Sequence, residues 1–327
     1  MRDLLAIVIR CLAAAVSALL IACAAPAFAQ ELYLLNGITR DRAIGGDDSF
    51  AWVLDYSERL SEHFSYSLVY VNEGHLVGHH RDGLGAQLWA KTDLLDRRLS
   101  VAVGAGPYLY FDTAARPAPV VYADEHGVSM IYSLATTWHL NPRWGIQLRA
   151  NYIAIPRSID TTSFLVGIGY KFDARALPGA SAPWSAGGRN VNEVTAYLAR
   201  TYVNNFEAET AAGQALEYRR NLSRNVEWTL SAINEGNPGP LNRRGVMSEI
   251  WATRTVFDDR VTFGVGIGPY LSYDRRDNDR ARLSGAVSLT ASYRFPEHWV
   301  ARATWHRVAT DYHKDTDVFL IGAGYRW

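Results

Sequence analysis

The chain has 327 residues, and its 33 Lys and Arg residues balance 33 Asp and Glu residues, so the formal net charge at pH 7 is zero. Acids and bases are interspersed along the chain, which argues against nucleic acid or another polyanion as a partner. Aromatic residues make up 12% of the sequence. After the N-terminal leader, no uninterrupted apolar run reaches the roughly 18 residues of a transmembrane helix.

The first 29 residues have the pattern of a secretory signal peptide. A charged head and an apolar stretch precede Ala27-Phe28-Ala29, which is a small-x-small cleavage site. A transmembrane helix is disfavoured because Arg10 interrupts the apolar stretch and Pro26 ends it. We therefore expect export, with cleavage after Ala29.

A second processing route lies inside the same leader. Residues 20–23 resemble the lipobox of bacterial lipoproteins, and its use would anchor the chain through a lipidated Cys23. The sequence leaves this choice open. Both cysteines, Cys11 and Cys23, lie in the leader, so a product cut after Ala29 has no disulfide or thiolate chemistry.

The rest of the chain contains one unit twice. Phe50 to Asp112 aligns without gaps with Ala212 to Asp274. After a shorter loop in the second copy, Asp160-Thr161 aligns with Asp315-Thr316. This is duplication rather than chance periodicity. The shared motifs include Asn72-Glu73-Gly74 with Asn234-Glu235-Gly236, Trp89 with Trp251, and Gly106-Pro107-Tyr108-Leu109 with Gly268-Pro269-Tyr270-Leu271.

Residues 173–190 separate the two copies and are rich in Ala, Pro, Gly and Ser. That composition is typical of a linker. We expect the first unit to span residues 30–172 and the second to span residues 191–327. Each unit has about 140 residues, a common domain size.

Each unit is predicted to form eight β-strands of about ten residues, the length with which a tilted strand crosses a bilayer. In the fifth strand, Leu99, Val103 and Phe111 share one face, whereas Gly104 and Asp112 share the other. Period two with one apolar face fits a barrel in lipid, but a water-soluble sandwich alternates in the same way. The strands of copy one lie near Leu32, Trp52, Tyr66, Gln87, Val101, Tyr132, Leu148 and Val166.

The C-terminus favours the membrane barrel. Phe319, Ile321, Ala323, Tyr325 and Trp327 alternate up to a terminal aromatic residue. This ending resembles the signal that the outer-membrane barrel assembly machinery reads. The mature chain resembles the small eight-stranded outer-membrane barrels, such as the OmpA transmembrane domain and lipid A deacylase. The resemblance implies an all-β fold of antiparallel up-and-down transmembrane barrels in the outer membrane of a Gram-negative bacterium.

Two arrangements of the sixteen strands are compatible with this pattern. One is two tandem eight-stranded barrels, and the other is a single sixteen-stranded barrel, since both unit ends would lie on the periplasmic side. We predict two barrels, because a single sheet would join the copies by a tight turn rather than by a long linker.

Charged residues fall on inward-facing positions of both units. An eight-stranded barrel is too narrow for an open channel, so these charges are expected to pair with one another and plug the interior. A path for a small solute is the alternative. The positions are Asp55, Lys91, Arg149 and Lys171 in copy one, and Glu217, Glu249, Arg302 and Arg326 in copy two.

A second group of polar residues is predicted at the outer barrel mouths. The repeated Asn-Glu-Gly motif ends the third strand, a loop holding an arginine follows, and an aspartate lies at the same end of the fifth strand. These residues could form a polar site, although Asn-Glu-Gly also suits a simple turn. The candidates are Glu73, Arg81 and Asp112 in copy one, and Glu235, Arg243 and Asp274 in copy two.

His75, His79 and His80 fall in one predicted loop of copy one, and clustered histidines can bind zinc or copper. The corresponding part of copy two has no histidine, and no partner ligands are evident. The pattern therefore favours no metal, and no cofactor is expected.

His306 invites comparison with lipid A deacylase, whose catalytic histidine lies on the penultimate strand with a serine two residues later. Here Val308 stands at the serine position, while Asp311 and Asp315 follow. A nucleophile needs a base within hydrogen-bond reach, so the missing serine argues against hydrolysis.

The sequence therefore favours a non-enzymatic outer-membrane protein whose extracellular loops contact lipopolysaccharide, a surface polysaccharide or another envelope protein. Outer-membrane lipids and the barrel assembly machinery are the other expected partners. Two alternatives stay open: a lipid-modifying enzyme at the outer leaflet and a porin for small solutes.

Overall fold

A computed structural model describes residues 30–42, 46–117, 121–156, 158–172, 191–207, 209–257, 259–277 and 280–327. The predicted leader (1–29), with Cys11 and Cys23, and the predicted linker (173–190) lie outside the described residues. No helix in the described ranges is long and apolar enough to cross a membrane.

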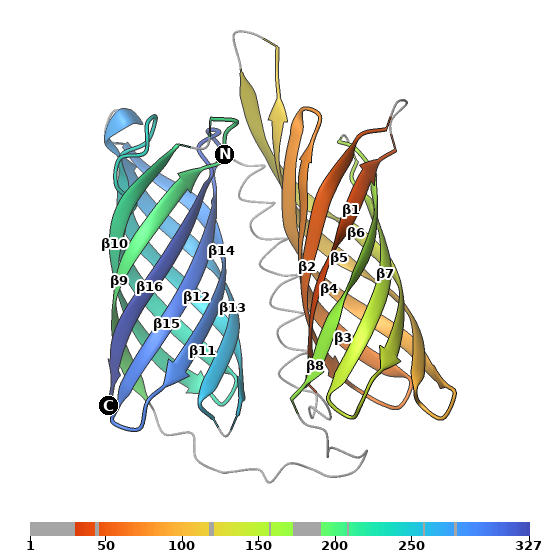
Figure 1. Ribbon diagram of the computed structural model, residues 1–327. Helices are drawn as coiled ribbons and strands as arrows, with labels where there is room; N and C mark the ends of the chain where they lie inside the picture. Colours follow the sequence, from red (N-terminus) through yellow and green to blue (C-terminus); the bar gives the residue numbers. More distant parts are fainter. Residues whose placement is uncertain are drawn as a thin grey trace. The chain divides into compact units, whose positions relative to one another are not determined.

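The first unit is a closed barrel of eight antiparallel strands (Figure 1). Each strand pairs with its neighbours in sequence, and the barrel closes where β1 pairs with β8, with Leu34 opposite Ile168. The strands are β1 (Gln30–Asp41), β2 (Asp48–Arg59), β3 (Phe64–Leu76), β4 (His79–Leu94), β5 (Leu99–Ala115), β6 (Tyr122–His139), β7 (Trp144–Ala154) and β8 (Thr161–Lys171).

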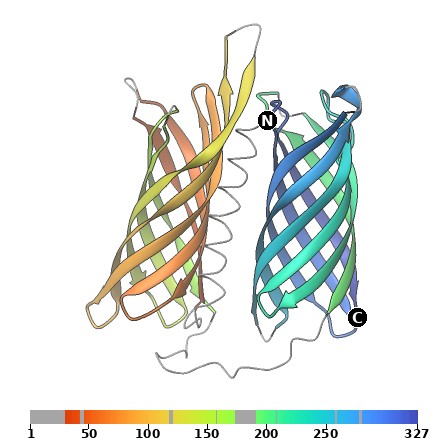
Figure 2. The ribbon, with the colours of Figure 1, turned by 180° about the vertical axis from the view of Figure 1, so that it is seen from behind.

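The second unit repeats this architecture, as the view from behind also shows (Figure 2). It closes where β9 pairs with β16, with Leu198 opposite Ile321. Because each sheet closes on itself, the prediction of two eight-stranded barrels is confirmed and a single sixteen-stranded barrel is excluded. The strands are β9 (Asn192–Val203), β10 (Thr210–Ser223), β11 (Val226–Asn234), β12 (Arg243–Val256), β13 (Val261–Asp274), β14 (Arg280–Arg294), β15 (Trp299–Ala309) and β16 (Thr316–Arg326), with a 3₁₀ turn, η1 (Arg275–Asp277), between β13 and β14.

Alternation of side chains gives each barrel an apolar exterior. Along β7, Trp144, Ile146 and Leu148 are exposed, whereas Gln147 and Arg149 are buried. Along β16, the terminal Phe319, Ile321 and Tyr325 are exposed in the same way. Large apolar side chains that are exposed on a closed barrel need a lipid surround, which a soluble sandwich would not provide.

Inside each barrel, small and apolar side chains occupy the half nearer the long loops. In barrel 1 this cluster includes Leu35, Val53, Val71, Tyr108 and Ile153. The corresponding cluster in barrel 2 includes Ile233, Met247, Tyr270, Val308 and Val318. The charged residues lie on either side of this apolar layer, at the mouth and toward the short turns.

The β3–β4 and β5–β6 hairpins of barrel 1 are longer than the sequence indicated. The β5–β6 hairpin rises beyond the other strands of its barrel (Figure 1), with 17 and 18 residues in β5 and β6. Ala115 N–H donates to the Gly78 carbonyl at 2.7 Å, so the two hairpins form one continuous sheet. Phe111, predicted to face lipid, is only 2% exposed. It lies in this extension, where four consecutive residues of β5, Phe111 to Ala114, are buried.

Candidate functional site

A buried ion pair closes the mouth of barrel 1. Arg81 Nε lies 2.5 Å from Glu73 Oε2, and its Nη2 lies 3.0 Å from Oε1, with no exposed surface on either side chain. The remaining donors reach the β7–β8 loop: Nη1 donates to the Ile159 carbonyl at 2.7 Å and Nη2 to Thr161 Oγ1 at 2.8 Å. Arg81 therefore ties the β3–β4 hairpin to the last loop of its barrel.

Barrel 2 has the same arrangement from the repeated residues. Arg243 Nε lies 2.6 Å from Glu235 Oε1 and Nη2 lies 2.8 Å from Oε2, again without exposed surface. Nη2 also donates to Thr316 Oγ1 at 2.6 Å, and Nη1 donates to the Lys314 carbonyl at 3.1 Å. We call Glu73–Arg81–Thr161 and Glu235–Arg243–Thr316 the mouth clamps.

The predicted aspartates hold the same last loops from a second side. Asp112 accepts from Ser158 Oγ at 2.8 Å, and its Oδ2 lies 2.9 Å from His79 Nδ1. Asp274 accepts from Lys314 Nζ at 2.9 Å. The structure thus brings all six predicted mouth residues to the two mouths, but as buried supports of the last loops rather than as an open binding site.

The sequence indicated that Arg81 and Arg243 lie in loops, but they lie at the beginning of β4 and of β12. β3 continues past Glu73 to Leu76 through a register shift between Asn72 and His75, so Glu73 and Arg81 face each other across one hairpin. In barrel 2, by contrast, β11 ends at Asn234. The β3–β4 hairpin of barrel 1 therefore extends further than the β11–β12 hairpin of barrel 2.

The three candidate metal-binding histidines lie on this extended hairpin. His75 belongs to β3, whereas His79 and His80 belong to β4. The His75 and His80 rings are 4.1 Å apart, but His79 faces Asp112. Among the described residues, no group of three His, Cys, Asp or Glu side chains is placed to hold a metal ion.

The interior of barrel 1 is organised around Trp89. Arg149 Nη1 lies 2.7 Å from Asp55 Oδ2, its Nε donates to Gln147 Oε1 at 2.9 Å, and its Cζ lies 5.0 Å from the centroid of the Trp89 ring. Two further pairs lie nearer the short turns. They are Lys91 with Asp93 at 3.7 Å and Lys171 with Glu31 at 3.3 Å.

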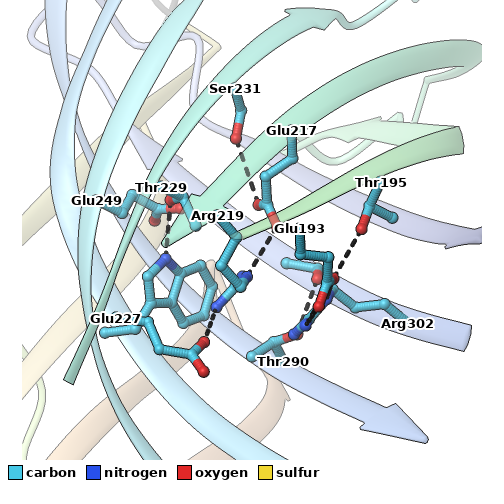
Figure 3. A network of polar contacts seen from close by, with 12 residues as sticks. Glu193, Thr195, Glu217, Arg219, Glu227, Thr229, Ser231, Glu249, Thr290 and Arg302 are labelled. Carbon is cyan, nitrogen blue, oxygen red and sulfur yellow. Dashed lines mark hydrogen bonds and ion pairs between the residues drawn. The ribbon is translucent and has the colours of Figure 1, made fainter. Parts of the chain in front are cut away.

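The interior of barrel 2 carries a denser ionic network (Figure 3). Arg219 pairs with Glu217 at 3.0 Å and with Glu227 at 2.8 Å, and its Cζ lies 4.6 Å from the Trp251 ring centroid. Arg302 pairs with Glu193 at 2.8 Å, and Arg326 lies 3.8 Å from the same glutamate. The predicted interior charges did not include Glu193, Arg219 and Glu227, although period two from Glu217 places Arg219 on the same inward face.

His306 has a hydroxyl partner that the sequence did not reveal. Its Nδ1 lies 2.6 Å from Ser288 Oγ, which also donates to Glu249 Oε1 at 2.5 Å. Ser288 comes from β14, directly opposite His306 in the sheet, so only the strand register could have found it. All three side chains are at most 2% exposed. Serine, histidine and glutamate therefore meet inside barrel 2, out of contact with solvent.

The two aspartates proposed with His306 lie elsewhere. Asp315 Oδ1 accepts from the backbone N–H of Thr310 at 2.6 Å and from its hydroxyl at 2.9 Å, which orders the β15–β16 loop. Asp311 is exposed on that loop. The acid beside His306 is instead Glu249, with Oε2 at 3.6 Å from Nδ1.

No protein-family model and no curated protein matches the chain. Solved structures similar to it include small outer-membrane barrels that each cover about one unit. Neisserial surface protein A shares 12% identity over 44% of this chain and 97% of its own, with a TM-score of 0.36. The N-terminal barrel of Pseudomonas aeruginosa OprF shares 12% over 45% and 98%, with a TM-score of 0.35. Yersinia pestis Ail shares 14% over 43% and 98%, with a TM-score of 0.32.

The fold itself decides the class of protein. Two closed antiparallel barrels with charged interiors, apolar exteriors and terminal aromatic residues have the architecture with which strands cross an outer membrane. The predicted fold and location are thereby confirmed, and the chain is an outer-membrane β-barrel protein of two eight-stranded units.

Proposed function

We propose that the protein is a non-enzymatic surface protein whose extracellular loops contact lipopolysaccharide, a surface polysaccharide or another envelope protein. The observation that carries this proposal is the repeated mouth clamp. In both barrels, a fully buried arginine fixes the last extracellular loop to a neighbouring hairpin. An ordered loop loses less conformational entropy on binding, so ordered loops suit recognition.

The barrel interiors support surface contact over solute transport. In each barrel an apolar cluster lies between the mouth clamp and the ionic groups toward the short turns. An eight-stranded barrel is just wide enough for its own side chains, and an apolar layer opposes the passage of ions.

The extended sheet of barrel 1 is the surface best placed for contact. Beyond the clamp, β5 and β6 continue to Ala115 and from Tyr122, while barrel 2 has the short η1 turn at that place. Val77 and Val121 are exposed on it at 79% and 69%. The two barrels therefore share a scaffold but present different surfaces, as expected if the loops diverged toward different contacts.

Planar-bilayer conductance of the refolded protein, run beside its detergent gel shift, separates contact from transport. We expect a heat-modifiable protein without stable current steps. Large steps would overturn the proposal in favour of a porin.

Shortening the extended sheet tests the contact directly. Residues 113–124 are replaced by an Asn-Gly turn, and binding to lipopolysaccharide vesicles and to purified surface polysaccharide is compared with that of the unaltered protein. We expect the binding to be lost while the gel shift is kept. Binding by the shortened protein at full affinity would contradict a role for this surface.

The Ser288–His306–Glu249 contact supports a second candidate, hydrolysis of a lipid ester. Serine, histidine and glutamate are residue types of nucleophilic catalysis, but Ser288 and Glu249 both lie against Nδ1 of His306, and all three side chains are buried inside the barrel. Mass spectra of lipid A from cells carrying the wild type or Ser288→Ala decide the matter. A lipid A acylation pattern that differs from that of cells without the gene when the wild type is present, but not when Ser288→Ala is present, would establish the enzyme.

A further inference from the structure

Barrel 1 contains a cavity of about 60 Å³ among the ends of its strands near the short turns. Most of the residues that line it are polar, and they include Ser57, Arg59, Ser65, Lys91 and His139 beside the carboxylates of Glu31 and Asp55. These residues come from the end of β2, the start of β3, the lower part of β4 and the end of β6. In an outer-membrane barrel the short turns face the periplasm, so the cavity opens to that side.

The cavity exists because barrel 1 lacks an ion pair that barrel 2 has. Ser57 and Ser65 align with Arg219 and Glu227, which pair at 2.8 Å and fill the corresponding space. The strand registers agree, since Arg59 lies opposite Ser65 as Asn221 lies opposite Glu227. Two hydroxyls thus stand where barrel 2 has two long charged side chains.

The cavity also carries an excess of positive charge. Four inward cations lie in or beside it, and three of them have carboxylate partners. Arg59 is the fourth, and in the described part of the chain no carboxylate lies within ion-pair distance of it. The paired cations are Arg149 with Asp55 at 2.7 Å, Lys91 with Asp93 at 3.7 Å and Lys171 with Glu31 at 3.3 Å.

We propose that this cavity binds a small oxyanion from the periplasmic side, with Arg59 and Lys91 as its charge partners and Ser57 and Ser65 as hydroxyl donors. A guanidinium presents two parallel N–H groups that match two oxygens of one oxyanion. The volume corresponds to roughly four water-sized positions, which suits a single phosphate group. That group comes either from free phosphate or from a phospholipid headgroup of the inner leaflet. The proposal is independent of the surface role of the loops.

The test titrates inorganic phosphate into the refolded full-length protein in zwitterionic detergent at low salt, with phosphorus NMR and calorimetry as readouts. Arg59→Gln removes the unpaired charge, and we expect a loss of affinity of about tenfold to a hundredfold. Ser57→Arg with Ser65→Glu installs the ion pair of barrel 2 without changing net charge, and we expect it to abolish binding while the gel shift persists.

Arg143→Gln is the matched control, because Arg143 lies on the exposed β6–β7 turn at the same end of the barrel, outside the cavity lining. It should bind phosphate as the wild type does. Absence of saturable binding by the wild type, or an equal loss in Arg143→Gln, would overturn the proposal. Nanodiscs identify the source: competition by phosphatidylglycerol, but not phosphatidylcholine, indicates the headgroup, and undiminished phosphate binding in both indicates the free anion.

Discussion

The buried tryptophan of each barrel stacks against an arginine, but the two arginines come from different strands. Trp89 meets Arg149 of β7, whereas the equivalent Trp251 meets Arg219 of β10. The acid is equivalent in both, Asp55 in one and Glu217 in the other. The two units therefore place the cation on different strands while its two partners are at equivalent positions, which indicates that the barrel needs the charge at that place rather than a particular residue.

This exchange predicts a rescue. Arg149→Thr gives barrel 1 the residue that barrel 2 has at that position, leaves Asp55 buried without a partner, and should cost about 3–5 kcal/mol of the free energy of unfolding. Adding Ser57→Arg places an arginine where barrel 2 has Arg219, at the same sheet position relative to the acid and the tryptophan, and should restore most of that loss. Urea unfolding followed by tryptophan fluorescence and gel mobility measures both. A double variant no more stable than the single one would refute the equivalence.

At this scale, the sequence predicts which side chains of one strand face inward, but contacts between side chains of different strands also depend on the register. Glu217 and Arg302 were found because alternation alone identifies an inward position. Ser288 was not found as the partner of His306, because the two residues meet only through the β14–β15 register. The cavity beside Arg59 was likewise not predicted, because it exists only where the short side chains of Ser57 and Ser65 leave interior space unfilled.

At the level of the strand, the repeated Gly-Pro-Tyr-Leu motif interrupts a ladder at the same place in each barrel. The β4–β5 pairing skips from Gly85 with Tyr108 to Leu88 with Ala105, because Pro107 has no N–H to donate. The strands approach closely there, and a Cβ on Gly106 would overlap the carbonyl oxygen of Ala86. The glycine is therefore required by the backbone of the neighbouring strand.

Gly106→Ala should accordingly destabilise barrel 1 by about 1–3 kcal/mol or more, since the obstructing atom belongs to the backbone. Gly285→Ala in β14 is the control, because its Cβ would meet nothing within 4 Å. We expect the control to unfold at the same or a higher urea concentration. Equal loss in both would mean that the close approach does not limit stability.

The mouth clamp predicts a second contrast. Arg81→Met leaves Glu73 buried and unpaired, so it should cost about 3–5 kcal/mol and raise hydrogen exchange in the β7–β8 loop. Arg40→Gln breaks an exposed pair with Asp48, 64% and 48% exposed, and should leave the urea midpoint and the exchange of the β7–β8 loop almost unchanged. If exchange in the loop did not change in Arg81→Met, the clamp would not be what orders it.

Strand number and alternation were predictable because the exterior is apolar and the period is two. The length of the hairpins was not, since β3 to β6 of barrel 1 continue beyond the apolar belt, and consecutive residues at the end of β5 are buried without alternation. Phe111 and the three histidines were misplaced for this reason.

At the scale of the whole molecule, each of the two described sheets closes on its own eight strands. Each unit should therefore fold and unfold independently of the other. With a protease site placed in residues 173–190, cleavage should yield two fragments that each keep a heat-modifiable band. Gly106→Ala should shift the band of barrel 1 alone, and loss of both bands would show that the barrels depend on each other.

The mouth clamp joins residues that are far apart in the order of synthesis. Thr161 is synthesised 80 residues after Arg81, and Thr316 is synthesised 73 residues after Arg243. Until the last hairpin of a barrel arrives, its glutamate and arginine have no enclosed place to meet. The clamp therefore forms only in a completed barrel. In a chain that ends one hairpin earlier, the mouth is open and both charged side chains are in water.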